Sequence, residues 1–335
     1  MSEVVHGGRL DQAIERHGGD RAKWLDLSTG INPVPWPIPE VSKEAWTQLP
    51  DQSAISACRA SARKHWHLAE QAHVSLAPGS QMHLQVLPFL FKPQPVAVVG
   101  FTYQEHGVCW ARAGHSVYVT DGLESAEASA RIVVIVNPNN PDGRIADGAE
   151  LTALARRLAA KGGLLVVDEA FADVTPGASI AGEAGREGLL VLRSLGKFFG
   201  LAGARVGFAL CSKTLGHRLD DSLGPWAVSG PALEIATKAL ADVRWQTAAR
   251  KKLATRREQL ETALFDGGLD VVGGTDLFVL ARHDLALALA EHLAADRILV
   301  RSFPGKPDWL RFGLPATKPA LSRLGKSLRS FQSAG

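Results

Sequence analysis

The stretch LRSLGKFFGLAGARVGFAL, residues Leu192 to Leu210, connects one short apolar run to another. It is rich in glycine and apolar residues, yet it carries two cations, Lys197 and Arg205. A buried cation is costly unless an anion meets it or its side chain reaches solvent. The stretch therefore predicts either a loop that wraps an anion or two cations at the surface.

Short apolar runs around this loop predict a mostly parallel sheet. They are VAVVG from Val96, IVVIVN from Ile132, LLVVDEA from Leu164, LLVLRS from Leu189 and RVGFAL from Arg205. Continuous apolar runs of this length are typical of strands that are buried on both faces. Between two of them, AELTALARRLAAK places Leu151, Leu154 and Leu158 on one helical stripe. Strands that alternate with helices indicate an α/β domain.

The residue pattern changes on either side of this α/β region. Four prolines in NPVPWPIPE, residues 32–40, predict an extended connector after an N-terminal arm. After GPWAVSGPA, residues 224–232, a long charged helical stretch precedes two or three strands and further helices, which indicates a small α+β domain. We therefore expect an arm and connector over residues 1–40, a large domain over 41–225 and a small domain over 226–335.

Composition excludes several classes of partner. The chain has 335 residues, 46% of them apolar, and its 37 basic and 34 acidic residues are scattered, so we expect neither nucleic acid nor a membrane as a partner. The three cysteines lie far apart, which predicts buried thiols in a reducing compartment. No apolar run suits a signal peptide or a membrane span, so we expect the cytoplasm. We expect no metal, because alternate histidines in HWH, residues 65–67, would point to different faces of a helix.

Polar residues that follow the apolar runs are the candidates for chemistry, because ligands in open α/β sheets lie beyond the carboxyl ends of the strands. These residues are Asn137, Asn139 and Asn140 in NPNNPDGR, then Asp168 and Glu169, then Arg193, Ser194 and Lys197. Upstream, APGSQ places Gly79 before a helix start, where backbone N–H groups can meet an anion. Turns, helix caps and surface cations would explain each motif alone. Their occurrence after successive strands favours one shared site.

Pyridoxal phosphate is a cofactor that would use all of these groups. A lysine binds its aldehyde, an aspartate keeps its pyridine nitrogen protonated, and a cation with serine and backbone donors holds its phosphate. Lys197, Asp168 and Arg205 are of the required types. With this cofactor, neither cation of the opening stretch would remain unpaired.

The motifs resemble those of class I and II aminotransferases. SLGKFFGLAGARVG is similar to the family's cofactor-attachment signature, and NPNNPDG and DEAF are similar to its two other fingerprints. The resemblance covers nearly the whole chain. It implies the pyridoxal-phosphate fold type I, with a mostly parallel large-domain sheet and a smaller α+β C-terminal domain, and a homodimer with the active site at the subunit interface.

The same resemblance implies a role for each matching residue. Lys197 would bind the cofactor covalently, Asp168 would face the pyridine nitrogen, and Asn140 would bond the phenolic oxygen. Tyr103 would stack on the ring. The phosphate would be held by Gly79, Ser80, Gln81, Ser194 and Arg205.

The sequence departs from the family's pattern at two places. Phe171 stands where many members have a tyrosine that bonds the phenolic oxygen, so Asn140 would do this alone. The segment QLPDQS, residues 48–53, lacks the tyrosine that many members lend to the partner subunit's phosphate. The source of a cross-subunit contact therefore stays open.

Motifs at the two ends of the chain bear on the reaction. HGG at His6, LDLSTGINPVPWP at Leu25, PWAVSGPA at Pro225 and ILVRS at Ile298 resemble the branch of this family that decarboxylates O-phospho-L-threonine in cobalamin synthesis. The motifs of histidinol-phosphate aminotransferases overlap with them heavily. The resemblance implies that Arg311 grips a substrate carboxylate and that Arg301 is a second substrate-binding arginine. His6, Ser28 and Asn32 would contact the substrate or only order the arm.

Three functions therefore stay open at this point. The first is a lyase acting on a phosphorylated amino acid, with Lys197 returning a proton to the α-carbon after carbon dioxide leaves. The second is an aminotransferase that uses a phosphorylated amino donor and 2-oxoglutarate. The third is a ligand-sensing protein built on the same fold. The reaction depends on which bond to the α-carbon stands perpendicular to the cofactor plane, and decarboxylation requires the carboxylate to be held there.

Overall fold

The computed structural model describes residues 7–334, and they form two compact units. The large unit consists of Pro35–Asn140 and Ile145–Trp245. The small unit consists of the described residues up to Val34, of Pro141–Arg144, and of the chain from Gln246 onward. This division differs from the expected boundaries: residues 35–40 and 226–245 belong to the large unit, whereas the arm up to Val34 and residues 141–144 group with the C-terminal part.

The large unit is built on a mixed seven-stranded sheet with the strand order β2-β8-β7-β6-β5-β3-β4. The strands are β2 (His73–Ala77), β3 (Pro95–Val99), β4 (Ser116–Thr120), β5 (Ile132–Val136), β6 (Leu164–Asp168), β7 (Leu189–Ser194) and β8 (Gly207–Cys211). The pairs from β4 to β7 are parallel, whereas β8 runs antiparallel to both β7 and β2. The expected mostly parallel sheet is therefore confirmed.

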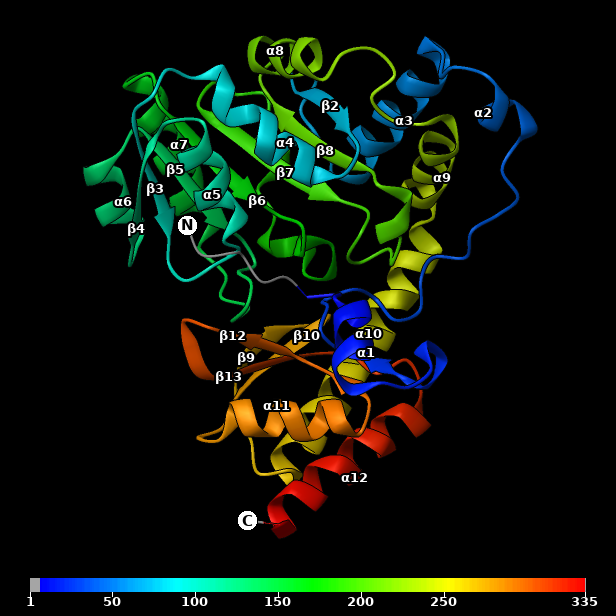
Figure 1. The fold of residues 1–335 in the computed structure, drawn as a ribbon. Coiled ribbons are helices and arrows are strands. Elements are labelled where there is room, and N and C mark those ends of the chain that lie inside the picture. The colour runs from blue at the N-terminus through cyan, green and yellow to red at the C-terminus, as the bar shows by residue number, and fades with distance from the viewer. Residues whose placement is uncertain (1–6, 335) are drawn as a thin grey trace. The chain divides into compact units, whose positions relative to one another are not determined.

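The helices of the large unit, most of which pack on this sheet, are labelled in Figure 1. They are α2 (Lys43–Thr47), α3 (Gln52–His65), α4 (Ser80–Val86), α5 (Glu105–Arg112), α6 (Leu123–Ser129), α7 (Gly148–Ala160), α8 (Lys213–Leu223) and α9 (Gly230–Ala241). Helix α7 follows the predicted stripe, because Leu151, Leu154 and Leu158 are fully buried. The side chain of Asp147 caps this helix by accepting the N–H of Glu150 at 2.9 Å. Helix α4 packs against β8, and α7 packs against β6.

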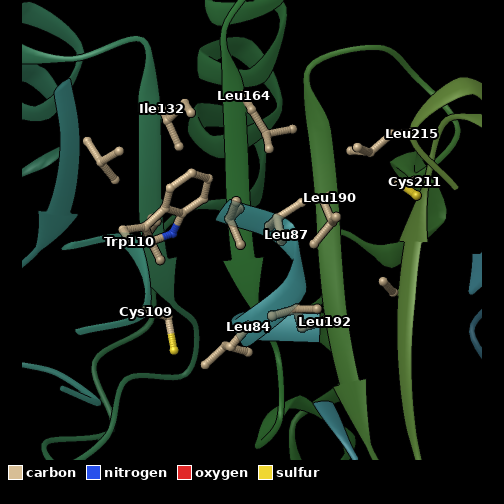
Figure 2. Packing of buried hydrophobic residues seen from close by; sticks show 14 of the residues in the cluster. Leu84, Leu87, Cys109, Trp110, Ile132, Leu164, Leu190, Leu192, Cys211 and Leu215 are labelled. Atoms are coloured by element: carbon tan, nitrogen blue, oxygen red, sulfur yellow. The ribbon is translucent and has the colours of Figure 1, made fainter. Parts of the chain in front are cut away.

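Alternate residues of the strands form the core on one face of the sheet (Figure 2). Ile132 of β5, Leu164 of β6, and Leu190 and Leu192 of β7 pack with Trp110 of α5 in one buried cluster. Truncating a buried leucine to alanine typically costs about 2–5 kcal/mol. This core therefore holds β5, β6 and β7 firmly, up to the strand ends where the polar residues begin.

The three cysteines are free and buried, as expected. Burial raises the pKa of Cys58 to about 12 and that of Cys109 to about 11, so both thiols stay protonated at neutral pH. Within residues 7–334, no helix is both long and apolar enough to cross a membrane.

The small unit contains an antiparallel sheet with the order β12-β13-β10-β9. Its strands are β9 (Asp270–Thr275), β10 (Phe278–Arg282), β12 (Arg301–Phe303) and β13 (Lys306–Gly313), and its helices include α1 (Leu10–His17), α11 (Ala286–Ala295) and α12 (Lys318–Ala334). Helix α10 (Val243–Asp266) leads into this unit from the large one. Strand β1 (Leu25–Asp26) of the arm pairs in parallel with β11 (Ile298–Leu299), which explains why the arm groups with the C-terminal part.

Candidate active site

The candidate cofactor residues of the large unit lie where β5, β6 and β7 end. Asp168 is the last residue of β6, and Ser194 is the last residue of β7. Asp168 pairs in register with Leu192, and Asn137 directly follows β5. Because these strands are parallel, their carboxyl ends meet at one edge of the sheet. The structure therefore places the predicted polar residues together.

Asp168 is held on both carboxylate oxygens. Its Oδ2 lies 2.9 Å from Nε2 of His106, and its Oδ1 accepts the N–H of Ala170 at 3.0 Å. His106 comes from α5 and is buried, as is Asp168. His106 was not predictable from the sequence, because a single histidine on a helix also suits an ordinary core position. This arrangement fixes the direction of the carboxylate and leaves it suited to hold a protonated ring nitrogen.

Tyr103 lies against this pair. Its ring meets the ring of His106 edge-on, with centroids 6.0 Å apart and an interplanar angle of 88°. Its hydroxyl donates to Oε1 of Gln81 at 3.0 Å, and Nε2 of Gln81 donates to Glu105 at 3.1 Å. Burial, and then the neighbouring carboxylates of Glu105 and Asp168, raise the pKa of Tyr103, so its hydroxyl stays neutral. The side chain of Gln81 thus contacts Tyr103 and Glu105, whereas its backbone N–H belongs to the first turn of α4, where N–H groups have no partner within the helix.

The residues predicted to hold a phosphate adjoin one another. A Cβ on Gly79, whose φ is +81°, would lie 2.4 Å from Nη2 of Arg205. A Cβ on Gly207 would lie 1.9 Å from the backbone nitrogen of Ser80, and Gly207 pairs in register with Ser194. Two glycines therefore allow the start of α4 to approach both β8 and a guanidinium, so that the backbone N–H groups of this helix start lie close to the donors of Arg205.

Lys197 is half-buried, and its Nζ lies 5.5 Å from the ring centroid of Phe171. Phe171 is 4% exposed and follows Asp168 by three residues. The phenylalanine places an apolar surface beside the amine and offers no hydroxyl. The departure from the family's tyrosine is thus located next to Lys197.

The three asparagines after β5 fall into two groups. Asn137 donates to the carbonyl of Ala178 at 3.1 Å, and Asn139 accepts from the hydroxyl of Thr102 at 2.6 Å. Both are buried and hold the turn in place. Asn140 is the least buried of the three. It is therefore the asparagine best placed to meet a ligand.

The small unit brings two predicted arginines together. Arg301 of β12 and Arg311 of β13 are register partners on adjacent strands. Arg311 is 6% exposed, and its Nη2 donates to the carbonyl of Ser28 at 2.8 Å. Burial, and then the charge of Arg301, lower the pKa of Arg311 to about 9. Two neighbouring guanidinium groups offer several N–H donors in the fork geometry that matches carboxylate and phosphate, so this pair suits an anionic ligand.

The predicted arm residues are involved in ordering the arm. The hydroxyl of Ser28 donates to Asp26 at 2.6 Å and accepts the N–H of Gly8 at 2.8 Å. Asn32 accepts the N–H of Val34 at 2.9 Å. Their contact with a substrate stays a prediction, and His6 lies outside the described residues.

The histidines of HWH serve different parts of the structure. His65 is the last residue of α3, and its Nε2 lies 3.2 Å from Asp173. His67 lies beyond the helix and has a φ of +51°. Over residues 7–334, no group of three or more histidine, cysteine, aspartate or glutamate side chains is arranged to hold a metal ion.

Comparison with known proteins places these residues in a family context. A sequence model of the family described as aminotransferase class I and II matches residues 22–323. A protein from Sinorhizobium named threonine-phosphate decarboxylase is 43% identical over 327 residues, which cover 97% of this chain and 97% of that protein. A protein of the same name from Pseudomonas aeruginosa is 43% identical over 334 residues, with 98% of each chain covered.

Solved structures show the same fold. Histidinol-phosphate aminotransferase from Sinorhizobium meliloti, solved in complex with pyridoxal-5'-phosphate, matches with a TM-score of 0.86 and covers 98% of this chain and 96% of its own. Its sequence is 21% identical, so this likeness establishes the architecture alone.

Proposed function

Because this chain belongs to the class I and II aminotransferase family, we propose that it is a pyridoxal-phosphate-dependent lyase. Its reaction would be the decarboxylation of O-phospho-L-threonine to (R)-1-aminopropan-2-ol O-phosphate. The observation that carries the proposal is the 43% identity, over nearly the whole chain, to two proteins named threonine-phosphate decarboxylase. The aminotransferase alternative is not favoured by these relatives.

The donor set of the large unit fits pyridoxal phosphate. Asp168 is a buried carboxylate fixed by His106, and the absence of a Cβ at Gly79 allows the guanidinium of Arg205 to approach the start of α4. Lys197 supplies an amine, and Arg205 with Ser80 and Ser194 supplies donors for a phosphate. When bound, this cofactor supplies a sink for the electron pair that remains at the α-carbon after carbon dioxide departs.

The residues of the large unit then have defined tasks. Asp168, with its orientation set by His106, holds the proton on the ring nitrogen. Lys197 binds the cofactor and delivers a proton to the α-carbon of the substrate. Tyr103 and Asn140 orient the ring, and the donors beside Gly79 anchor the phosphate.

The arginines of the small unit would select the substrate. O-phospho-L-threonine carries a carboxylate and a phosphate, and guanidinium groups bind both anions through paired N–H donors. Arg311 would grip the carboxylate, and Arg301 would contribute the second cation. Ser28 and Asn32, together with His6 of the arm, would complete the substrate contacts.

Product analysis tests the proposal. The purified protein with pyridoxal phosphate and O-phospho-L-threonine should release carbon dioxide without any 2-oxo acid, and Lys197→Ala should abolish the release. Turnover that requires 2-oxoglutarate and yields glutamate would establish the aminotransferase instead. Ligand binding with neither reaction would support the sensor.

A homodimer, a cytoplasmic location and a place in cobalamin synthesis belong to the same proposal. Large apolar side chains of the large unit are exposed, among them Trp46 at 69%, Leu49 at 66% and Trp226 at 54%. A second copy of the chain would cover such surface. Light scattering on the purified protein should then give twice the mass of 35.7 kDa, whereas a monomer would contradict the dimer.

A further inference from the structure

Three charged side chains of the large unit are almost fully buried behind the ends of β6 and β7. They are Glu169, Asp173 and Arg193, with exposed fractions of 0%, 2% and 1%. We call them the Arg193 cluster. The reaction proposed above uses none of them directly.

The guanidinium of Arg193 joins both carboxylates. Its Nη1 donates to Oε2 of Glu169 at 2.6 Å, and its Nη2 donates to Oδ1 of Asp173. One planar fork thus connects two acidic residues that lie four positions apart in the chain. A lysine could not reproduce this arrangement, because its ammonium is a single point charge.

Further contacts fix each carboxylate from other parts of the chain. Oε1 of Glu169 accepts the N–H of Ile180 at 2.7 Å. Oδ1 of Asp173 accepts the indole N–H of Trp66 at 3.1 Å, and the guanidinium of Arg193 lies 5.1 Å from the centroid of the same indole. Several contacts from different parts of the chain therefore fix the positions of these three charged groups.

The cluster is directly connected to the candidate cofactor residues along the chain. Glu169 follows Asp168, and Arg193 precedes Ser194. Successive side chains of a strand point to opposite faces, so Arg193 lies on the other face of β7 from Ser194. The backbone N–H of Glu169 also donates to the carbonyl of Leu192 at 2.9 Å. The cluster thus connects the end of β6 to the end of β7, with Arg193 on the face of β7 opposite to Ser194.

Stability alone does not account for this arrangement. Replacement of a buried ion pair by apolar residues is often neutral or stabilising, because burying the charges offsets their attraction. The pKa values of the two carboxyl groups reflect both burial and attraction to the neighbouring cations. Burial raises the pKa of Glu169, whereas Arg193 and His65 overcome the effect of burial and hold the pKa of Asp173 below its usual range. The contacts hold the three charged side chains in one arrangement.

We propose that Arg193 is a positioning residue, which holds Asp168 and the Ser194–Lys197 segment at a fixed separation through Glu169 and Asp173. This inference rests on the proposed function, in which those residues bind pyridoxal phosphate. Loss of the fork would let the two strand ends move relative to each other. Asp168, which would face the ring nitrogen, and the Ser194–Lys197 segment, which would bind the phosphate and the aldehyde, would then no longer lie at the separation that one cofactor molecule requires.

The test compares Arg193→Lys with Arg157→Lys. Arg157 is a matched control, because its Nε donates to both oxygens of Glu127 at 3.0 and 2.9 Å on the exposed side of α7. Two quantities are measured with pyridoxal phosphate: its dissociation constant, and the midpoint of the pH titration of its visible absorbance when bound. The titration reports the charges around the cofactor, which a general loss of stability does not move.

Arg193→Lys should weaken cofactor binding about tenfold and shift the titration midpoint by about one pH unit, as expected for the loss of one hydrogen bond to a charged group. Arg157→Lys should change neither quantity. A wild-type titration midpoint and dissociation constant in Arg193→Lys would overturn the proposal, even if its melting temperature fell. If Arg193→Lys does not fold, Glu169→Gln replaces it, and failure of both variants to fold would assign the cluster to folding alone.

Hydrogen exchange without cofactor separates this inference from the proposed function. If the wild-type protein does not take up pyridoxal phosphate, the proposed function fails. In that case, the positioning role of Arg193 is tested by the exchange rates of two backbone amides. These are the amide of Glu169, which donates to the carbonyl of Leu192, and the amide of Leu195, which donates to the carbonyl of Val206. Exchange that is about tenfold faster at both amides in Arg193→Lys, and unchanged in Arg157→Lys, would support the positioning role. Equal rates in wild type and Arg193→Lys would refute it.

Discussion

Nε2 of His106 lies 2.9 Å from Oδ2 of Asp168, and both residues are at most 5% exposed. This contact connects α5 to the carboxyl end of β6. It also connects Tyr103, whose ring meets that of His106, to the same carboxylate. A substitution at His106 should therefore disturb the proposed cofactor site without removing any group that binds the cofactor.

His106→Asn removes the partner of Oδ2 and leaves Asp168 in place. We expect kcat/KM to fall about tenfold to a hundredfold, because a hydrogen bond to a charged group contributes about 1.5–3 kcal/mol. Steady-state kinetics and cofactor titration measure this effect. His115→Asn is the control, since His115 is also buried but contacts the carbonyl of Pro88 at 3.0 Å. Equal activity in His106→Asn and wild type would contradict the assigned role.

Gly79→Ala should displace Arg205 from the start of α4. The new Cβ would lie 2.4 Å from Nη2 of Arg205, at a backbone φ of +81°. We expect a loss of about 1–3 kcal/mol in unfolding free energy from the backbone strain, together with weaker cofactor binding. Urea unfolding and cofactor titration measure the two effects.

Gly203→Ala is the matched control for this substitution. Gly203 precedes Arg205 by two residues, and a Cβ there would meet no atom within 4 Å. Its cofactor affinity should equal that of wild type. Unchanged affinity in Gly79→Ala as well would show that the phosphate does not bind beside Gly79.

Arg311→Gln should raise KM for the phosphorylated substrate more than it lowers kcat. Loss of a charge-assisted contact to the carboxylate is worth about 1.5–3 kcal/mol, or about tenfold to a hundredfold in KM. Arg301→Gln should also raise KM. It should in addition raise the pKa of Arg311, because Arg301 contributes to lowering it.

Arg282→Gln controls for a change of charge in the same sheet. Arg282 is an exposed residue of β10, and its Nη2 lies 3.2 Å from Asp270. We expect its KM to match that of wild type. A KM that rises as much in Arg282→Gln as in Arg311→Gln would show a general effect of charge rather than a binding site.

His83 should make the unfolding free energy depend on pH below neutrality. Burial lowers the pKa of His83 from 6.5 to about 4, although Asp220 opposes this shift. The unfolded chain therefore takes up a proton that the folded protein excludes. The unfolding free energy should decrease as pH falls from 6.5 to about 4, by up to about 1.4 kcal/mol for each unit.

Urea unfolding of wild type and His83→Asn at several pH values measures this contribution. The carboxylates titrate in both proteins, so the difference between their pH profiles isolates the histidine. We expect the wild-type profile to be steeper over this window. Parallel profiles would show that His83 titrates as an ordinary histidine.

The sequence predicted much of the large unit because its buried strands are continuous apolar runs. β5, β6 and β7 coincide with the runs at Ile132, Leu164 and Leu189. β4 was not predicted, because this edge strand is largely exposed and has no such run. The pairing of β1 with β11 was not predictable either, because two-residue strands from opposite ends of the chain have no local pattern.

The positions of Asp168 at the end of β6 and of Lys197 shortly after β7 were predictable, because both residues follow continuous apolar runs, whereas their roles stay predictions. The contact of His106 with Asp168 was not predictable, since it brings together a residue of α5 and the end of β6, which lie far apart in the sequence. Arg193 and Glu169 were recognised as polar residues after strands. Their mutual burial follows from side-chain alternation and from contacts with Trp66 and Ile180, which no local pattern encodes.

The most direct test of the account follows the fate of the substrate's α-carbon. The protein with pyridoxal phosphate is incubated with O-phospho-L-threonine in deuterium oxide, without any 2-oxo acid. We predict one carbon dioxide for each aminopropanol phosphate, with one deuterium on the carbon that carried the carboxylate. An oxo product with no carbon dioxide, and a cofactor left as its amine, would contradict the account.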